Sequence, residues 1–238
     1  MSQKRKEYCI RLAARCVVLA LCAAAAVTKP ELYDLLDGMN FFSRLSPLHL
    51  LWLVWMVDMV YQIIPLKSSV ALGSRKLFAA YFRPGRDGFH PECLQRYITS
   101  ANKAAMKVAA LWTGLIAFIG LLFHMDILNK IGLFLLSAAF YVCDLICVLV
   151  WCPFRLIMKT RCCTTCRIFN WDHIMMFSPL IFLDGFFTGS LVAMAVLALL
   201  AWEISIMVHP ERFWEKANIA LKCSECTDRL CTQYCGRS

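Results

Sequence analysis

Half of the 14 cysteines in this chain fall in two short polar stretches, and these thiols have the clearest potential for chemistry. The two stretches contain Cys162, Cys163, Cys166, Cys223, Cys226, Cys231 and Cys235. A C-x-x-C turn brings two thiolates within reach of one ion, and two such turns make a closed tetrahedral site of four sulfur ligands. The spacing therefore predicts a metal ion held by cysteines.

Two C-x-x-C turns supply the natural ligand set, which is Cys163, Cys166, Cys223 and Cys226. The tail could instead hold an ion by itself, through its own four cysteines. Cys231 is the first reserve ligand, with Cys162 and Cys235 behind it. The shared site requires the loop with Cys163 and Cys166 and the tail with Cys223 and Cys226 to lie on the same face of the protein.

Zinc is the metal that best suits a closed structural site of this kind. An iron–sulfur cluster is also held by four cysteines, although the spacing differs from the C-x2-C-x2-C-x3-C-P run of bacterial ferredoxins. In a reducing cytoplasm, clustered cysteines indicate metal or redox centres rather than structural disulfides. We expect zinc, with an iron–sulfur cluster as the alternative; a reversible disulfide, or no cofactor, stays open.

Acidic side chains inside apolar runs form a second group of candidates. They are Asp58, Asp144, Asp184 and Glu203. An ionisable group in hydrocarbon costs about 2.5–3.5 kcal/mol, so it should face the interior of a helix bundle and have a partner. Together these acids would suit a polar path, a proton relay or a cation site. Hydrogen bonding between helices explains them equally well, and Asp184 and Glu203 could lie at the membrane surfaces.

The elements that must position these residues are apolar helices. Apolar residues make up 60% of the chain and charged residues 17%, whereas soluble domains carry about 25% charged residues. The apolar residues gather in runs close to the roughly 20 residues that cross a bilayer as a helix. Lipid offers no hydrogen-bond partners to the backbone, so these runs must be helices. The chain is thus predicted to be an all-α polytopic membrane protein, with apolar runs at 12–28, 48–66, 104–123 and 131–151.

A fifth apolar run, 174–208, is too long for one crossing. As a single helix it would measure about 52 Å, against a hydrocarbon core of about 30 Å. A break is expected at Ser178-Pro179, at Asp184-Gly185 or at Thr188-Gly189-Ser190. The last choice gives helices at about 172–187 and 191–208, and six spans in all. An interfacial segment to about residue 184 followed by one span would give five.

The distribution of basic residues favours six spans. Lys and Arg concentrate in cytoplasmic loops, and here they alternate strongly between rich and poor loops. The rich segments are the amino terminus, the loop after the second run and the loop after the fourth. Both termini are therefore predicted to be cytoplasmic, with the first run kept as an uncleaved anchor. A membrane domain at 1–208 would carry a cysteine-rich tail, 209–238, that packs on the 152–173 loop. A helix beginning at Pro91 is expected to continue into the third span.

Two resemblances arise from the cysteine stretches. The run Arg161-Cys162-Cys163-Thr164-Thr165-Cys166-Arg167-Ile168-Phe169-Asn170-Trp171-Asp172, with the cysteine-rich tail, resembles an uncharacterised family of bacterial polytopic membrane proteins. That resemblance implies an inner-membrane location and no activity. Trp151-Cys152-Pro153 followed by Cys163-x-x-Cys166 faintly resembles membrane polyferredoxin subunits, but the repeated C-x-x-C-x-x-C runs of those proteins are missing.

Three functional hypotheses follow, and enzymatic activity is left open. The first is a scaffold or assembly protein of the cell inner membrane with a structural zinc site. The second is a redox component that passes electrons between a cysteine-ligated centre and a quinone or a membrane protein partner. The third is a small proton- or cation-coupled transporter that uses Asp58 and Asp144. The lipid bilayer is the expected surrounding, and nothing in the sequence indicates nucleic acid.

Overall fold

A computed structural model describes residues 3–43, 45–64, 77, 81–85, 90–160 and 163–225, and within these ranges the chain is helical with no strand. Short helices and 3-10 turns connect five longer helices. The longer helices are α1 (Gln3–Thr28), α2 (Pro47–Ile63), α3 (Pro91–His124), α4 (Lys130–Leu149) and α7 (Phe186–Val208). The short α-helices are α5 (Phe154–Met158) and α6 (Asp172–Phe177). The predicted all-α class is confirmed.

Four helices, α1, α3, α4 and α7, are long and apolar enough to cross a membrane. The fifth, α2, is apolar but has only 17 residues. Large apolar side chains such as Leu50, Leu111 and Met207 point outward and are exposed. A soluble bundle would bury such residues, whereas helices surrounded by lipid expose them.

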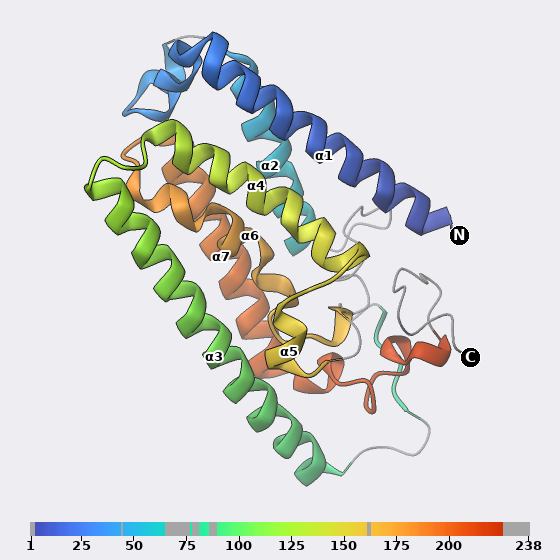
Figure 1. The fold of residues 1–238 in the computed structure, drawn as a ribbon. Helices are drawn as coiled ribbons and strands as arrows, with labels where there is room; N and C mark the ends of the chain where they lie inside the picture. The colour runs from blue at the N-terminus through green and yellow to red at the C-terminus, as the bar shows by residue number, and fades with distance from the viewer. Residues whose placement is uncertain are drawn as a thin grey trace.

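The helices form a bundle in which α1 and α3 lie on opposite flanks, with α4, α6 and α7 between them (Figure 1). The amino terminus, α5 and the first turns of α3 lie at one end, called here the α5 end. The 3-10 helix η1 (Pro30–Leu36), the α3–α4 turn and the start of α7 lie at the other, called the η1 end. The 152–173 loop, called here the cysteine loop, therefore lies at the same end of the bundle as the amino terminus.

Helix starts follow local signals in the sequence. Ser46 caps α2, and its backbone N–H donates to Nδ1 of His49 at 3.0 Å. The other ring nitrogen of His49 must then carry the proton, and it donates to the Phe41 carbonyl at 2.8 Å. Asn129 caps α4 through its side-chain oxygen. Pro91 begins α3, which runs unbroken to His124, as predicted for a helix continuing into the third span.

The long last apolar run is interrupted at residues 183–185. The helix α6 ends at Phe177, a 3-10 helix η7 (Ser178–Phe182) follows, and α7 begins at Phe186. The prediction of one helix from 172 to 187 was wrong, because Pro179 lacks the N–H that would continue α6. Residues 188–190 lie inside α7, so the break falls at the second of the three expected places.

Gly185 allows this break because its backbone packs directly on η1. Gly38 donates from its N–H to the Asp184 carbonyl at 2.7 Å, and Phe186 donates to the Gly38 carbonyl at 2.9 Å. A Cβ atom on Gly185 would overlap with the carbonyl oxygen of Leu36. Only glycine permits so close an approach between two backbones. The contact joins the turn before α7 to the loop after α1.

An aromatic core occupies the middle of the bundle. Trp55 of α2 is fully buried and lies 5.2 Å from Phe177, 5.8 Å from Phe134 and 5.8 Å from Tyr141 between ring centroids. Three elements therefore meet at this ring of α2, since its partners come from α4 and α6. Asp58 and Asp144 each lie three residues after a member of this core, so they stand one helical turn away on the same faces.

Residues 209–222 return to the α5 end and pack beside the cysteine loop. The Tyr97 hydroxyl of α3 lies 3.2 Å from the carbonyl of Phe213 and 3.4 Å from that of Thr165. Ile219 donates its N–H to the Arg83 carbonyl at 2.8 Å. The first part of the tail is thus tied both to the 163–165 turn and to the segment before α3.

Candidate functional site

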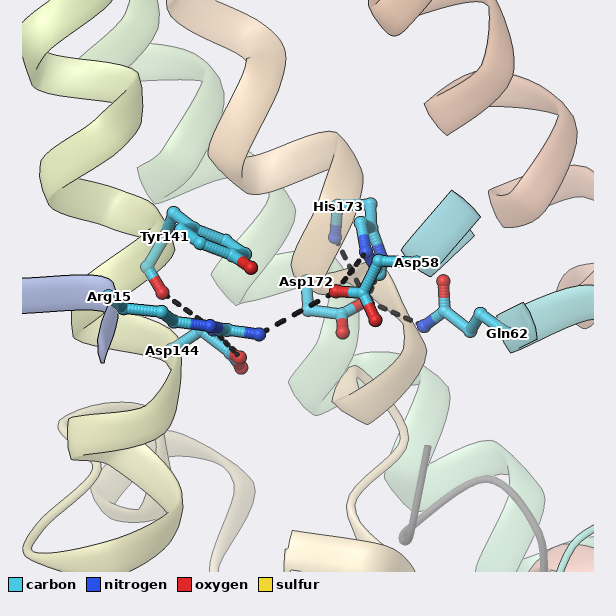
Figure 2. A network of polar contacts seen from close by, with 7 residues as sticks. All are labelled: Arg15, Asp58, Gln62, Tyr141, Asp144, Asp172 and His173. Atoms are coloured by element: carbon cyan, nitrogen blue, oxygen red, sulfur yellow. Dashed lines mark hydrogen bonds and ion pairs between the residues drawn. The ribbon is translucent and has the colours of Figure 1, made fainter. Parts of the chain in front are cut away.

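Arg15 of α1 lies at the centre of a buried group of charges (Figure 2). Its Nη1 atom donates to Oδ2 of Asp144 at 2.9 Å and to the Tyr141 carbonyl at 2.6 Å. Its Nη2 atom lies 3.6 Å from Oδ2 of Asp58. The guanidinium carbon also stands 3.7 Å from the centroid of the Tyr141 ring. One cation therefore joins α1 to α2 and to α4.

Asp172 and His173, at the start of α6, extend this group. Asp172 accepts hydrogen bonds from Gln62 of α2 at 2.7 Å and from the His173 backbone N–H at 2.9 Å. The His173 ring places Nδ1 3.1 Å from Asp172 and Nε2 3.6 Å from Asp58. Asp58 thus stands between the Arg15 cation and the His173 ring, and it links the two halves.

We call Arg15, Asp58, Asp144, Asp172 and His173 the charge network. Its side chains are between 7% and 25% exposed, and they come from four helices. The network holds three carboxylates against one guanidinium and one imidazole. Its formal charge is therefore −2 with a neutral imidazole and −1 with a protonated one. In surroundings of low dielectric such an imbalance is costly unless a proton or another cation compensates it.

Two cavities meet the charge network from different directions. A groove of about 900 Å³ runs along α1 and α2 from Arg11 to Tyr33, and Arg15 and Asp58 lie on its wall. A smaller cavity of about 230 Å³ reaches Asp144 and Asp172 from the α5 end. Arg15 and Asp58 line the larger space, whereas Asp144 and Asp172 line the smaller one, so the buried charges border both.

Five cysteines line the smaller cavity, namely Cys143, Cys147, Cys152, Cys163 and Cys166. The neighbouring Cys147 thiol, and after it the backbone N–H groups of Phe154 and Arg155, lower the pKa of Cys152 to about 6. The sulfur of Cys163 lies 3.9 Å from the Cys147 carbonyl. Cysteines from the end of α4 and from the 163–166 turn are thus gathered around one space.

The predicted four-cysteine metal site is only partly covered by the described residues. Cys162, Cys226, Cys231 and Cys235 lie outside them, as does the side chain of Cys223. Among the described side chains, no group of three or more His, Cys, Asp or Glu residues is arranged to hold a metal ion. Cys163 and Cys166 begin and follow a 3-10 turn, with the Cys166 N–H donating to the Cys163 carbonyl at 2.9 Å.

The four predicted acids are divided among three places. Asp58 and Asp144 meet at Arg15 in the charge network. Glu203 of α7 instead accepts hydrogen bonds from Arg167 at 2.7 Å and from Trp171 at 2.8 Å, and so holds the loop before α6. Asp184 is exposed in the turn at the η1 end. The structure therefore brings two of the four together.

Three members of the charge network were not predicted as site residues. Arg15 was interpreted as one of the basic residues of the amino terminus, although it lies inside the first apolar run. Asp172 and His173 stand directly before the last apolar run, where polar residues are common. One signal in the sequence could have revealed the pairing of Arg15 with the acids. Arg15 lies inside one apolar run, and Asp58 and Asp144 lie inside two others.

Comparison with protein-family models, with curated proteins and with solved structures finds no match for this chain. The chemistry of its own residues is therefore the basis on which a function is assigned.

Proposed function

We propose that this protein is a proton-coupled membrane transporter in which the charge network binds and releases the proton. The observation that carries the proposal is the excess of carboxylates over cations in the network, at a place reached by two cavities. Ionisable residues inside a bundle commonly mark proton or ion pathways, because their burial is costly without such a role.

Protonation would change the contacts that hold the bundle together. Arg15 forms ion pairs with both Asp58 and Asp144. A proton on one carboxylate therefore weakens its ion pair with Arg15 and strengthens the ion pair with the other carboxylate. The carboxylates belong to α2 and α4, and Arg15 belongs to α1. A proton bound at the network thus shifts the balance between two helix contacts, which is the kind of two-state element that coupled transport requires.

The broken passage at 172–185 supports the same function. Asp172 and His173 begin α6, and the chain then reaches the η1 end through the 3-10 helix η7. Substrate and ion sites of secondary transporters are typically formed by discontinuous helices of this kind. We count this passage and α2 as crossings with the four long helices, which gives six. Both termini would then be cytoplasmic, because the basic amino terminus, the start of α3 and α5 lie at the α5 end, and a cell inner membrane is the proposed location.

The test is proton flux in liposomes that contain the purified protein and a pH-sensitive dye. An inside-negative potassium diffusion potential should drive proton uptake faster than in protein-free liposomes. We expect Asp58→Asn and Asp144→Asn to lower the rate about tenfold or more, since an amide neither binds nor releases a proton in this range. Glu92→Gln, which alters an exposed carboxylate at the start of α3, is the matched control and should keep the wild-type rate.

Absence of flux above the protein-free level would overturn the proposal, as would full flux in both Asn variants. Folding is checked separately by the elution volume and melting temperature of each variant in detergent. The infrared absorbance of protonated carboxyl groups gives a second readout, and it should change with pH in the wild type and less in Asp58→Asn.

A structural zinc site is a second proposed role, and one contact favours it. The Tyr97 hydroxyl contacts both the Thr165 carbonyl and the Phe213 carbonyl, so the start of the tail lies beside the turn that carries Cys163 and Cys166. Cys163, Cys166, Cys223 and Cys226 remain the proposed ligands. Zinc per chain should fall in both Cys163→Ser and Cys223→Ser; loss only in the second would indicate a tail-only site, and unchanged zinc in both would exclude the shared site.

A further inference from the structure

The groove along α1 and α2 extends well beyond the two members of the charge network that line it. The helix α1 lies on one flank of the bundle and packs along α4, whereas it makes few contacts with α2 (Figure 1). Apolar residues of both helices line the groove, and several of them are exposed, namely Leu21, Leu50, Leu53, Val54 and Val57. In a membrane such walls are as compatible with lipid tails as with other apolar side chains.

We propose that the groove binds one anionic phospholipid, with the phosphate at Arg11 and one acyl chain lying towards Tyr33. Positive charge at one end and apolar walls along the rest carry this proposal. It does not depend on proton transport, because the acyl chain covers Asp58 only from the groove, and the smaller cavity still reaches Asp144.

The end of the groove at Arg11 is strongly basic. Residues 3–15 contain one acid, Glu7, and five cations, namely Lys4, Arg5, Lys6, Arg11 and Arg15. Arg11 lies on the wall of the groove one helical turn before Arg15, and Glu7 lies 2.7 Å from its guanidinium. Basic segments at a membrane surface attract anionic headgroups, and a guanidinium is well suited to donate to phosphate oxygens. The charge of this end is therefore complementary to an anionic headgroup.

The groove also has the length of one lipid. From Arg11 to Ala25, α1 spans about 21 Å at roughly 1.5 Å per residue. One leaflet has about this depth, since a bilayer with its headgroups is about 40–45 Å thick. At the other end η1 folds back on α1, because the Tyr33 hydroxyl donates to the Cys22 carbonyl at 2.7 Å, and Leu32 and Tyr33 line the groove there. An acyl chain, which ends within the membrane, therefore fits better than a partner helix, which must cross it.

Native mass spectrometry of the full chain in detergent tests the site. The purified, delipidated protein is incubated with phosphatidylglycerol or with phosphatidylcholine of the same acyl chains, and the lipid retained per chain is measured. We expect one phosphatidylglycerol per chain, bound about tenfold or more tightly than phosphatidylcholine, because no choline cation offsets the charge of its phosphate.

Arg11→Gln tests the headgroup contact and should lower the affinity for phosphatidylglycerol about fivefold to tenfold, towards that of phosphatidylcholine. Arg96→Gln is the matched control. Arg96 also pairs with a glutamate four residues earlier, Glu92, and it lies at the same end of the bundle on α3. This variant should keep the wild-type affinity.

Val54→Trp tests the place of the acyl chain, since it puts a large ring into the groove and should weaken the binding of both lipids. Leu111→Trp adds the same ring at an exposed position of α3 and should weaken neither.

Equal retention of the two lipids by the wild type, or an unchanged affinity in Arg11→Gln, would overturn the proposal. Full lipid binding in Val54→Trp would show that the acyl chain lies elsewhere, and a dimer that excludes lipid would show that a second copy of the chain fills the groove; either result overturns it. The melting temperature of each variant without lipid shows whether lost binding reflects a lost fold. Phosphatidylglycerol should raise the melting temperature of the wild type more than that of Arg11→Gln.

Discussion

Arg15 makes four kinds of contact at once, and its chemistry explains why. It donates to a carboxylate and to a backbone carbonyl, lies beside a second carboxylate, and stacks on the Tyr141 ring. A planar, weakly hydrated guanidinium with five donors is suited to all four, whereas the ammonium of lysine is a compact point charge. The side chain is only 14% exposed, so little solvent screens these contacts.

Removal of the Arg15 side chain should destabilise the bundle strongly. Arg15→Ala removes the cation shared by Asp58 and Asp144 and leaves only the His173 ring beside Asp58, and breaking a buried pair in this way costs about 3–5 kcal/mol. Arg15→Lys should recover part of the loss. The free energy of unfolding in detergent measures both. Arg15→Ala combined with Asp144→Asn should be less destabilised than Arg15→Ala alone; a double variant that loses the sum of both single effects would contradict the coupling.

Glu203 should hold the cysteine loop in place. Its carboxylate accepts from Arg167 and Trp171, and Glu203→Gln leaves the Arg167 cation without its counter-ion at a cost of about 1–3 kcal/mol. We expect faster proteolytic cleavage between residues 150 and 171 in this variant. Glu92→Gln, on an exposed surface, serves as the control. Equal cleavage rates in the two variants would show that the contacts of Glu203 with Arg167 and Trp171 contribute little to the order of the loop.

At the scale of elements, the turn before α7 depends on one glycine. Gly185→Ala forces a methyl group against the Leu36 carbonyl, so the Gly38–Asp184 hydrogen bond must stretch or break. We expect a loss of about 1–3 kcal/mol, in the range for overpacking against a rigid neighbour. Gly189→Ala lies one turn further along α7 with open space around its Cβ position, and there a gain of up to about 1 kcal/mol is expected. The melting temperatures of Gly185→Ala and Gly189→Ala, compared with that of the wild type, test both expectations. A Gly185→Ala variant as stable as the wild type would contradict the close packing on Leu36.

The helices themselves could be predicted because their cause is local. Runs of apolar residues set where α3 and α4 lie, and Pro91 and Asn129 mark their starts. The place of the break before α7 could only be narrowed to three candidates. Its cause is the packing of Gly185 on Leu36, and these residues are too far apart in the chain for a local pattern to reveal it.

At the scale of the whole molecule, the charge network is assembled from distant parts of the chain. Arg15 and Asp144 are separated by 129 positions, and Gln62 and Asp172 by 110. Asp58 and Asp144 could be singled out because an acid in an apolar run is costly wherever it lies. Their partners could not, since Arg15 also fits a basic amino terminus and His173 also fits a loop end. The cysteine spacing predicted ligand pairs, whereas the cavity shared by five thiols needed the fold.

Topology is also a property of the whole chain, and six crossings require a cytoplasmic carboxyl end. A reporter that is active only outside the cytoplasm, fused after Ser238, should be inactive, and one that is active only in the cytoplasm should work. The same two reporters placed after residue 36 should give the opposite result, because η1 lies at the other end of the bundle. Identical results at the two positions would exclude an even number of crossings between the amino terminus and Ser238.

The distance along the chain between Arg15 and its partners also bears on biosynthesis. The first helix leaves the ribosome carrying a cation whose insertion costs about 2.5–3.5 kcal/mol, and Asp144 is not yet made. Asp58 arrives first, but at 3.6 Å it is the weaker partner. A chain that stalls before α4 therefore keeps a poorly compensated charge in its first helix. Stable insertion of the first helix therefore depends on the synthesis of α4.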